Sequence, residues 1–319
     1  MIWVGILGAK GYLGESLSKL IAGHQSAQVS IIHDFQNLSE SVCCNCGSIE
    51  KSTGYLSMAN AINKSDIIFN GFSGTMAEDI YSKALSKGKK IINIGDPYPG
   101  NGAYPGSVYG LSELYKDKMR DIPIAANPSS YCTGAVLGLA PLAEGNIIDI
   151  NTVVIESKSG ISCLRCGDKL ACTDSTVSNG INVYKMDCRD YAEEVNKQMF
   201  ELFGKKAAPS YTSYVIPGVK GIITKIIANP YNEFCRNDIL EVYREFYKLN
   251  PLIEVCDADT INEAGKGPGN CFCRISASSD KNTGNITVTT MLDDAIRGYA
   301  SQAIQTMNLM YGIDGKTGL

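Results

Sequence analysis

The sequence IWVGILGAKGYLGESLSKLIA, residues 2–22, decides the fold of the first half of the chain. It opens with an apolar run, residues 2–7, that is typical of a short buried strand. A GxxGxxG loop follows at residues 8–14, and residues 12–22 carry their apolar side chains on one helical face. Glycines in such a loop let the backbone approach a pyrophosphate, and the helix N-terminus offers it unpaired N–H groups. The stretch therefore predicts a strand–helix unit that binds a dinucleotide; the alternative is a tight turn without a ligand.

A second strand, residues 29–32, ends close to Asp34, which lies 20 residues past Gly14 (34 − 14 = 20). At this spacing a carboxylate can accept a hydrogen bond from the ribose 2′-hydroxyl, which favours NAD. Lys10 favours the opposite choice, because a cation near the loop can meet the 2′-phosphate of NADP. A solvated strand end is the alternative for Asp34. The sequence thus predicts NAD or NADP as the cofactor.

Further apolar runs alternate with helical patterns up to Pro141, and after it the elements change in kind. The first part is expected to contain strands at 66–70, 90–94 and 122–126, with a helix at 76–87. The second part is expected to contain strands at 147–157 and 285–291, helices at 191–203 and 237–249, and a long helix at 294–311. Strands that alternate with helices imply a parallel sheet. We therefore predict an α/β protein with a Rossmann-type, doubly wound parallel sheet and a second α+β domain, inserted before a C-terminal helix that returns to the first domain.

Length and charge narrow the remaining possibilities. The 319 residues suggest about two domains. We expect a dinucleotide-binding domain at 1–145 plus 295–319 and a substrate and oligomerisation domain at 146–294. The net charge of -4 argues against a nucleic acid or an anionic membrane as partner, since proteins that bind these usually carry a basic surface. No apolar run approaches the ~20 residues of a membrane helix, and no basic leader precedes the first strand, so the expected location is the cytoplasm.

Five motifs appear in the same order as in a known reductase family. They are Gly8-Ala-Lys-Gly-Tyr-Leu-Gly14, Tyr109-Gly-Leu-Ser-Glu-Leu114, Asn127-Pro-Ser-Ser-Tyr-Cys-Thr-Gly-Ala135, Lys158-Ser-Gly-Ile-Ser162 and Met307-Asn-Leu-Met-Tyr-Gly-Ile-Asp314. Over nearly the whole chain they resemble N-acetyl-gamma-glutamyl-phosphate reductase, a relative of aspartate-semialdehyde dehydrogenase. The resemblance implies a Rossmann domain that holds NADP, a second domain that completes the substrate cleft, and a homodimer or homotetramer. It also implies that a cysteine attacks an acyl phosphate to form a thioester, that a histidine moves protons, and that the products are a semialdehyde and phosphate.

The residues that would carry this chemistry depart from the family pattern. Ser130 stands at the position of the nucleophilic cysteine, and a hydroxyl without an adjacent base is a poor nucleophile. Cys132 replaces a proline of the family; on a helix it would point about 200° away from Ser130, and a packed helix cysteine is the alternative. Arg189 falls beside the lost histidine; it can bind a carboxylate or an oxyanion but cannot act as a base. Glu194 matches a glutamate of the family, with an exposed helix carboxylate as the alternative. These four are the candidate catalytic residues.

The cofactor is expected to contact these motifs and the ends of the strands. The candidates are Gly8, Ala9, Lys10, Gly11, Tyr12, Leu13, Gly14, Asp34, Ser73, Gly74, Asn127, Pro128, Ser159, Gly160 and Gln302. No metal is expected. The twelve cysteines include one CxxC pair, Cys163 and Cys166, with Cys172 close by. A metal or redox site is the alternative there to reduced thiols that a reducing cytoplasm tolerates.

Three functions follow from these residues. The first is an oxidoreductase that passes a hydride from NAD(P)H directly to a carbonyl, acyl or imine group of a small amino-acid-like carboxylate, which needs neither the thiol nor the base. The second is the authentic N-acyl-glutamyl-phosphate reductase reaction, with Ser130 as an engineered Cys→Ser change. The third is a catalytically inactive dinucleotide sensor.

Overall fold

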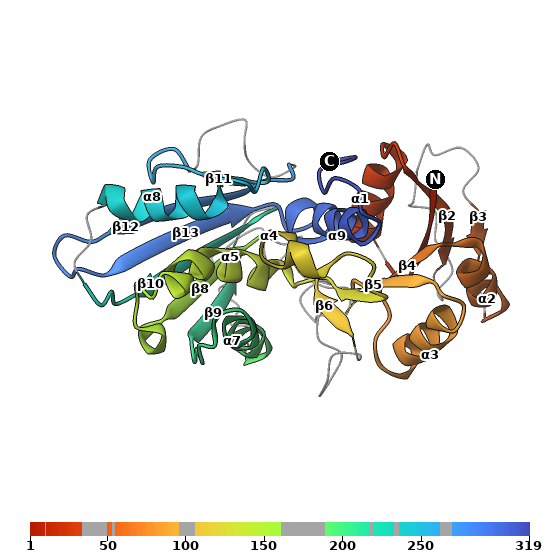
Figure 1. Ribbon diagram of the computed structural model, residues 1–319, viewed down its shortest axis with the longest axis horizontal. Coiled ribbons are helices and arrows are strands. Elements are labelled where there is room, and N and C mark those ends of the chain that lie inside the picture. Colours follow the sequence, from red (N-terminus) through yellow and green to blue (C-terminus); the bar gives the residue numbers. More distant parts are fainter. Residues whose placement is uncertain are drawn as a thin grey trace. The chain divides into compact units, whose positions relative to one another are not determined.

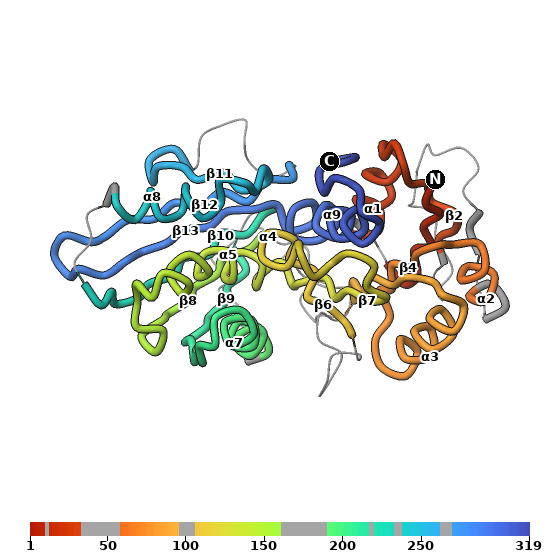
Figure 2. Tube along the Cα trace, viewed as in Figure 1, coloured from red at the N-terminus to blue at the C-terminus, as the bar shows by residue number. Residues whose placement is uncertain are grey.

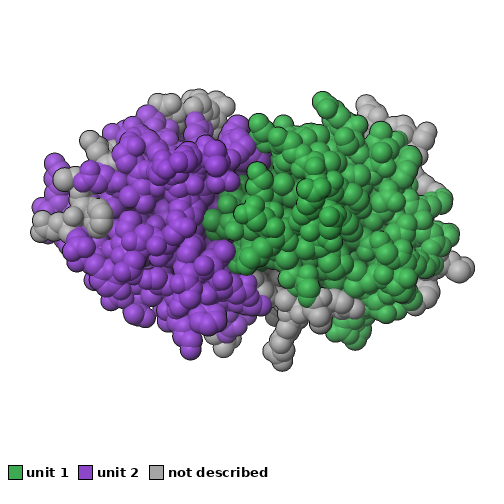
Figure 3. Space-filling model, viewed as in Figure 1, with its two compact units in different colours: residues 1–129, 299–319 green, residues 130–298 purple. Residues whose placement is uncertain are grey.

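The computed structural model describes residues 1–9, 11–33, 50–52, 55–95, 106–160, 189–216, 220–232, 236–261 and 270–319. This part of the chain divides into unit 1, residues 1–129 with 299–319, and unit 2, residues 130–298 (Figure 3). The domain limits expected from the sequence, 1–145 plus 295–319 and 146–294, differ mainly by one helix, which joins unit 2. The division of roles between the two domains stays a prediction.

Unit 1 is built on a parallel sheet of seven strands in the order β3-β2-β1-β4-β5-β7-β6 (Figure 1). The strands are β1 (Ile2–Leu7), β2 (Ala27–His33), β3 (Glu50–Ser52), β4 (Ile67–Asn70), β5 (Lys90–Asn93), β6 (Ser107–Tyr109) and β7 (Ile124–Ala126). The order steps outward from β1 in both directions, which is the doubly wound arrangement. The predicted fold class is confirmed.

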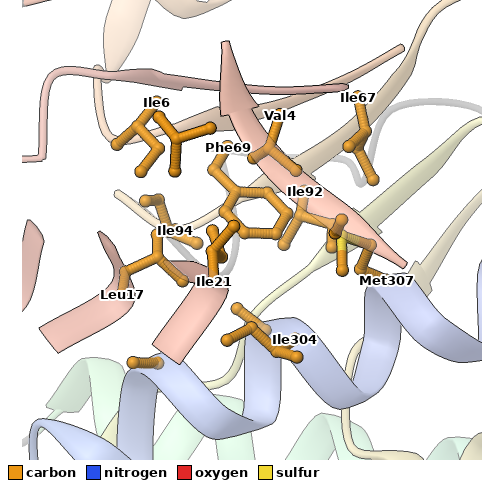
Figure 4. Close-up of a cluster of buried hydrophobic side chains, with 14 of the residues drawn as sticks. Val4, Ile6, Leu17, Ile21, Ile67, Phe69, Ile92, Ile94, Ile304 and Met307 are labelled. Atoms are coloured by element: carbon orange, nitrogen blue, oxygen red, sulfur yellow. The ribbon is translucent and has the colours of Figure 1, made fainter. Parts of the chain in front are cut away.

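Helices cover both faces of this sheet because its strands are apolar on both sides. On β4, Phe69 and its neighbour Ile68 point to opposite faces and join two separate buried clusters. One cluster packs under α1 (Gly11–Ala22) and α9 (Ser301–Met310), and the other under α2 (Tyr55–Lys64) and α3 (Gly74–Leu85). Figure 4 shows the first, where side chains of α1 and α9 meet those of the strands. Each fully buried isoleucine or phenylalanine stabilises the fold by about 1.5–3 kcal/mol.

The C-terminal segment returns to unit 1 as the sequence predicted. Figure 2 shows α9 beside α1, and hydrogen bonds fix the last residues there. His24 Nε2 and Asn308 Oδ1 lie 2.9 Å apart, and Asn308 Nδ2 donates to the carbonyl of Thr317 at 2.9 Å. The Tyr311 hydroxyl donates to the Asp66 carbonyl at 3.2 Å. Two short elements complete unit 1, α4 (Ser112–Tyr115) and the 3-10 turn Lys116–Lys118.

Unit 2 holds a mixed sheet of six strands in the order β11-β12-β13-β10-β8-β9. The strands are β8 (Val154–Ser159), β9 (Ser210–Val215), β10 (Ile222–Ala228), β11 (Ile253–Val255), β12 (Cys273–Ser279) and β13 (Ile286–Leu292), and the helices are α5 (Ser130–Glu144), α7 (Arg189–Phe203) and α8 (Arg236–Tyr247). A π-helical turn, Ile296–Ala300, leads from unit 2 to α9. Among the described residues no helix has the length and apolar character to cross a membrane.

The strand expected at 147–157 is wrong over its first half. Residues Ile150–Thr152 form a 3-10 turn, and β8 begins only at Val154. The Asp149 carboxylate accepts from the Asn151 backbone N–H at 3.0 Å, and the Thr152 hydroxyl donates to the Asp149 carbonyl at 2.7 Å. Such local side-chain bonds compete with strand pairing, and here they outweigh the apolar run.

Helix α5 lies close to the sheet because two glycines face it. A Cβ on Gly134 would lie 2.7 Å from Thr290 Oγ1, and one on Gly138 would lie 2.6 Å from Ile226 Cδ1. Pro141, inside the helix, has no N–H for the carbonyl four residues earlier, that of Leu137. The Tyr247 hydroxyl of α8 donates to this carbonyl at 2.6 Å and so replaces the missing bond.

Candidate functional site

The first candidate site lies where the strand order of unit 1 reverses, at the carboxyl ends of β1 and β4. Ligands of doubly wound sheets bind at this position, because the loops that follow the two strands run to opposite faces. Gly8 follows β1 with a φ of 68°, in the left-handed region that glycine tolerates. A Cβ there would lie 2.8 Å from the Phe72 ring, in the loop after β4.

Three successive loops stack at this edge through glycines. A Cβ on Gly71, after β4, would lie 2.7 Å from the Gly8 carbonyl oxygen, and one on Gly95, after β5, 2.5 Å from the Gly71 carbonyl oxygen. Gly14, in the first turn of α1, meets the loop in the same way, since its Cβ would lie 2.3 Å from the Ala9 carbonyl oxygen. Only residues without a Cβ allow backbones to approach this closely, so the edge is a cradle of bare backbone.

Two buried asparagines hold these loops in place. Asn70 Nδ2 donates to the Phe72 carbonyl at 3.0 Å, and its Oδ1 accepts from the Phe72 N–H at 3.3 Å. Asn93 Oδ1 accepts from the Gly95 N–H at 3.2 Å. Sequence reasoning missed both asparagines and also Gly71 and Gly95. The available signal was a polar residue at the end of each buried strand with a glycine one or two positions later.

Helix α3 begins directly after the β4 loop. Ser73 is its N-cap with extended backbone, and its side chain makes no capping hydrogen bond to a described residue. Gly74 follows with a φ of 61°, and a Cβ there would meet nothing within 4 Å. The unpaired N–H groups of the first turn of this twelve-residue helix therefore lie at the same edge of the sheet. These groups and the positive end of the helix dipole favour an anion there.

The remaining cofactor candidates of unit 1 have mixed outcomes. Asn127 follows β7 and has a relative exposure of 3%. Its Nδ2 donates to the Tyr299 carbonyl at 3.3 Å. Pro128 beside it is buried, and Gln302 is fully buried in α9. Gly11, Tyr12 and Leu13 lie in the first turn of α1. Lys10 and Asp34 lie outside the described residues, so the choice between NAD and NADP stays open.

Ser130 in unit 2 is the first residue of α5 and is half-buried. Gly298 of the π-helical turn packs directly on it, since a Cβ on Gly298 would lie 2.5 Å from Ser130 Cβ. Cys132 is fully buried, and its thiol donates to the Tyr191 carbonyl at 3.6 Å. The two side chains thus differ in environment as their spacing on a helix predicts. This environment supports a packing role for Cys132.

A cluster of tyrosines joins the first turns of α5 and α7. The rings of Tyr131 and Tyr191 are stacked with centroids 4.8 Å apart, and the ring of Tyr211 lies 5.8 Å from that of Tyr191. The Tyr211 hydroxyl donates to the Tyr131 carbonyl at 3.3 Å. Burial raises the pKa of Tyr211 well above its usual value, and Cys132 beside it adds to the rise. Tyr211 is therefore uncharged at neutral pH, and the three rings hold the two helix starts together.

This arrangement brings the catalytic candidates of unit 2 onto neighbouring helix starts. Arg189 is the first residue of α7 and Glu194, with a relative exposure of 6%, is buried one turn further along. Helices α5 and α7 pack against each other, and a site shared by Arg189, Glu194 and Ser130 stays a prediction. No spacing in the sequence indicates that Tyr131, Tyr191 and Tyr211 would come together in one cluster.

Ser159 and Gly160 end β8 in unit 2. The Ser159 hydroxyl lies 2.6 Å from that of Tyr131, and the Gly160 N–H donates to the Gly221 carbonyl at 3.0 Å. These contacts support the packing of unit 2, and the expected role of both residues toward the cofactor stays a prediction.

The cysteines in the described ranges, Cys132, Cys256, Cys271 and Cys273, form no disulfide with one another. The same ranges contain no group of three or more metal-ligating side chains. Cys163, Cys166 and Cys172 lie outside them.

Two family models match the chain. One, described as the NAD binding domain of semialdehyde dehydrogenase, matches residues 3–122, and the other, described as its dimerisation domain, matches residues 130–294. The second match begins at the residue where unit 2 begins.

Curated proteins and solved structures agree with these matches. The chain is 26% identical to N-acetyl-gamma-glutamyl-phosphate reductase of Desulforudis audaxviator and 28% identical to that of Caldicellulosiruptor saccharolyticus, over 100% of this chain and 98% of each relative. A crystal structure of aspartate semialdehyde dehydrogenase II from Vibrio cholerae, complexed with ASA, has a TM-score of 0.73 at 15% identity over 97% of this chain and 98% of that one. At this identity the structural match establishes the fold.

Proposed function

The chain belongs to the semialdehyde dehydrogenase family, and on this premise we propose that it reduces a carbonyl, acyl or imine group of a small amino-acid-like carboxylate with NADH or NADPH. Membership confirms the resemblance carried by the five sequence motifs and makes the chain an NAD(P)-dependent oxidoreductase. The substrate class follows the names of the curated relatives, which are reductases of N-acetyl-gamma-glutamyl phosphate. Nothing in the described residues favours an engineered Ser130 or an inactive sensor.

The observation that carries the proposal is the cradle of glycine loops in unit 1. The stacked loops after β1, β4 and β5 present backbone instead of side chains at the switch point of the sheet. A flat, anionic dinucleotide needs this surface, because the pyrophosphate must come close to N–H groups at helix N-termini. The residues present therefore fit a nicotinamide dinucleotide.

The proposed reaction uses the side chains of unit 2 for the substrate. When bound, the reduced nicotinamide supplies a hydride to the carbon of the C=O or C=N group. A ketone, aldehyde or imine gains this hydride and one proton from solvent, whereas an acyl phosphate gains the hydride and releases phosphate as it becomes an aldehyde. In each case the cofactor leaves oxidised. In the proposal Ser130 donates a hydrogen bond to the reacting oxygen or nitrogen, and Arg189 binds the substrate carboxylate. The role of Glu194, which is buried in α7, toward the substrate stays a prediction.

Cofactor binding can be followed through Trp3, the only tryptophan of the chain, which lies in β1. Energy transfer from Trp3 to the reduced nicotinamide should quench its emission as NADH or NADPH binds. Gly14→Ala should abolish the quenching, because its Cβ would lie 2.3 Å from the Ala9 carbonyl oxygen. The matched control is Gly23→Ala, where the nearest atom lies at 3.6 Å. Absence of quenching in the unaltered protein contradicts the proposal.

Turnover is measured as loss of NAD(P)H absorbance with a panel of amino-acid semialdehydes, 2-oxo acids and cyclic imines. We expect oxidation of the cofactor with at least one carboxylate-bearing member and none with its decarboxylated analogue. Tight cofactor binding without turnover of any member would instead support the inactive sensor.

We also propose that unit 2 forms the homodimer or homotetramer through the sheet face opposite α5. Val154 and Ile223 are 44% and 38% exposed, and the strand register puts them on this face. The family model that covers unit 2 is described as a dimerisation domain. Ile223→Glu should therefore reduce the mass measured by light scattering, whereas Phe200→Glu, on exposed α7 surface, should not. An unchanged mass for Ile223→Glu excludes this face.

The proposed setting is the cytoplasm, with a small molecule as substrate and no nucleic acid as partner. The net charge of -4 and the metabolic relatives support this setting. Fractionation of cells that express the tagged chain tests it.

A further inference from the structure

The carboxyl edge of the unit 1 sheet continues past the glycine cradle to the end of β7. The loops follow one another along the edge in strand order, and backbone bonds link them: Ile94 N–H donates to the Asn70 carbonyl, and Asn127 N–H to the Asn93 carbonyl, both at 2.8 Å. A dinucleotide held by its pyrophosphate at β1 has its adenosine on the β2 side, so its nicotinamide extends along β4, β5 and β7. Asn127 therefore stands at the nicotinamide end of the edge.

Two buried polar atoms at this end lack a hydrogen-bond partner among the described residues. They are Asn127 Oδ1 and Ser301 Oγ, on side chains with relative exposures of 3% and 0%. Buried polar atoms in folded proteins are nearly always paired, and leaving one unpaired costs about 1–3 kcal/mol. Two such atoms in one place call for a ligand that supplies the missing bonds.

Because its hydroxyl lacks a partner among the described residues, Ser301 differs from two other buried serines of unit 1, Ser18 and Ser65. Ser18 in α1 donates its hydroxyl to the Gly14 carbonyl four residues earlier at 2.8 Å, and Ser65, just after α2, donates to the Ala61 carbonyl at 2.7 Å. This return bond is the usual outcome for a serine in a helix. Ser301 directly follows the π-helical turn Ile296–Ala300, whose wider winding interrupts the four-residue spacing.

Asn127 bonds to the backbone just before Ser301. Asn127 Nδ2 donates to the carbonyl of Tyr299, two residues before Ser301. Because Nδ2 is used in this way, the asparagine amide is oriented and its Oδ1 remains as an acceptor. The Ser301 hydroxyl is a donor that can turn to suit its partner. One acceptor and one donor thus stand together at the nicotinamide end.

We propose that Asn127 and Ser301 bind the carboxamide of the nicotinamide ring, with Oδ1 accepting from its NH₂ group and the Ser301 hydroxyl donating to its carbonyl oxygen. The inference rests on the proposed function, since it assigns the ring end of the cofactor that the glycine cradle holds. It makes Ser301, which the family motifs do not mark, a binding residue that orients the ring.

The test compares three ligands by isothermal titration calorimetry: NADH, ADP-ribose, which lacks the nicotinamide, and reduced 3-acetylpyridine adenine dinucleotide, which lacks the NH₂ group. Ser301→Ala should weaken NADH about fivefold to tenfold and leave ADP-ribose unchanged. Unaltered protein should bind the acetylpyridine analogue several-fold more weakly than NADH, and Asn127→Ala should remove that difference. Ser65→Ala is the matched control, with NADH affinity as in the unaltered protein.

Thermal unfolding without ligand separates binding from a structural role. Because the Ser301 hydroxyl has no partner in the described residues, Ser301→Ala should keep or raise the unfolding temperature. A lower unfolding temperature, or an unchanged affinity for NADH, overturns the assignment. If unaltered protein fails to bind even ADP-ribose, the proposed function fails; if ADP-ribose binds and only the Ser301 effect is absent, the carboxamide assignment alone fails.

Discussion

The two regions that hold the candidate residues are made from different parts of the chain. In unit 1 the edge at β1, β4 and β5 is backbone brought together by Gly8, Gly71 and Gly95. In unit 2 the starts of α5 and α7 are joined by side chains, with Tyr131 stacked on Tyr191 and the Cys132 thiol on a backbone carbonyl. One region depends on the absence of side chains and the other on their identity.

This difference explains which part of the family pattern the chain keeps. A cofactor that is recognised by backbone N–H groups and close approach leaves little room for substitution, because every Cβ collides with main chain. Chemistry carried by a thiol and an imidazole can change when those two side chains change, while the helices that carry them stay in place. In our proposal the chain keeps the first region and differs from the family pattern at key residues of the second.

The largest effect should come from closing the cradle. Gly71→Ala places a Cβ 2.7 Å from the Gly8 carbonyl oxygen and 2.8 Å from its carbon, and backbone atoms cannot move aside without separating the loops. We expect the affinity for NADH to fall more than about a hundredfold, roughly 3 kcal/mol, in a Trp3 titration. Gly23→Ala should bind NADH normally. An unchanged affinity for Gly71→Ala would show that the cofactor does not depend on the stacked loops.

A smaller effect, confined to the other region, is expected for Gly298→Ala. Its Cβ would lie 2.5 Å from Ser130 Cβ and 3.1 Å from Leu292 Cδ1, so the first residue of α5 must shift. We expect kcat/KM to fall about thirtyfold, roughly 2 kcal/mol. The Kd for NADH should stay within about twofold, because Gly298 belongs to unit 2 and the cradle to unit 1. Equal losses in both quantities would mean that the two regions are not separable.

The next effect is on stability and concerns the hydrogen bond by which Tyr247 supports α5. We expect a loss of about 1–3 kcal/mol when this bond is removed. Tyr247→Phe removes the hydroxyl that satisfies the Leu137 carbonyl, left without its helical partner by Pro141, so the free energy of unfolding should fall by that amount. In the Pro141→Ala background the new alanine N–H can bond that carbonyl, and the same change should cost less. Urea unfolding of the four proteins measures the coupling. Tyr231→Phe, at a residue 55% exposed, is the control, and equal losses in both backgrounds would contradict the role assigned to Tyr247.

The sequence predicted the first strand and helix of the first region, β1 and α1, because their signals are local. The apolar run of β1, the glycines and the helical face of α1 fall within 22 residues, and each acts through neighbours in the chain. It missed β3, Glu50–Ser52, whose residues have no strand character. Glu50 pairs with Ile31, so this strand is created by the exposed edge of β2 and not by its own composition.

The second region could be predicted only in part. The sequence pattern can indicate that helices start near 130 and 190. The tyrosines that join these helix starts come from positions as far apart as 131 and 211, and no local pattern links them. The strand at 147–157 failed because a single carboxylate, Asp149, bonds locally. Tertiary contacts and short-range side-chain bonds of this kind leave no periodic trace in a sequence.

The smallest effect should come from Ser130 itself. If the hydride passes directly to the substrate, Ser130 contributes one hydrogen bond from a half-buried hydroxyl, and Ser130→Ala should lower kcat/KM by no more than about tenfold, roughly 1.4 kcal/mol. Ser130→Cys should likewise gain no phosphate-dependent oxidation of a semialdehyde, because no histidine follows α5 in the chain to take the proton of the new thiol. Both variants are assayed for reduction with NAD(P)H and for oxidation of a semialdehyde with NAD(P). Gly23→Ala, prepared in the same way, is the control for effects of mutagenesis and purification.

The two possible outcomes of that experiment lead to opposite conclusions about the region in unit 2. Phosphate-dependent oxidation by Ser130→Cys would mean that the starts of α5 and α7 still form a thioester site, so that a single atom separates this chain from the family reaction. A modest loss in Ser130→Ala and no gain in Ser130→Cys would mean that the tyrosine cluster preserves the helices while the covalent chemistry is gone. The cradle in unit 1 would then be the part of the ancestral mechanism that the chain still uses, because a hydride donor needs the same backbone whatever it reduces.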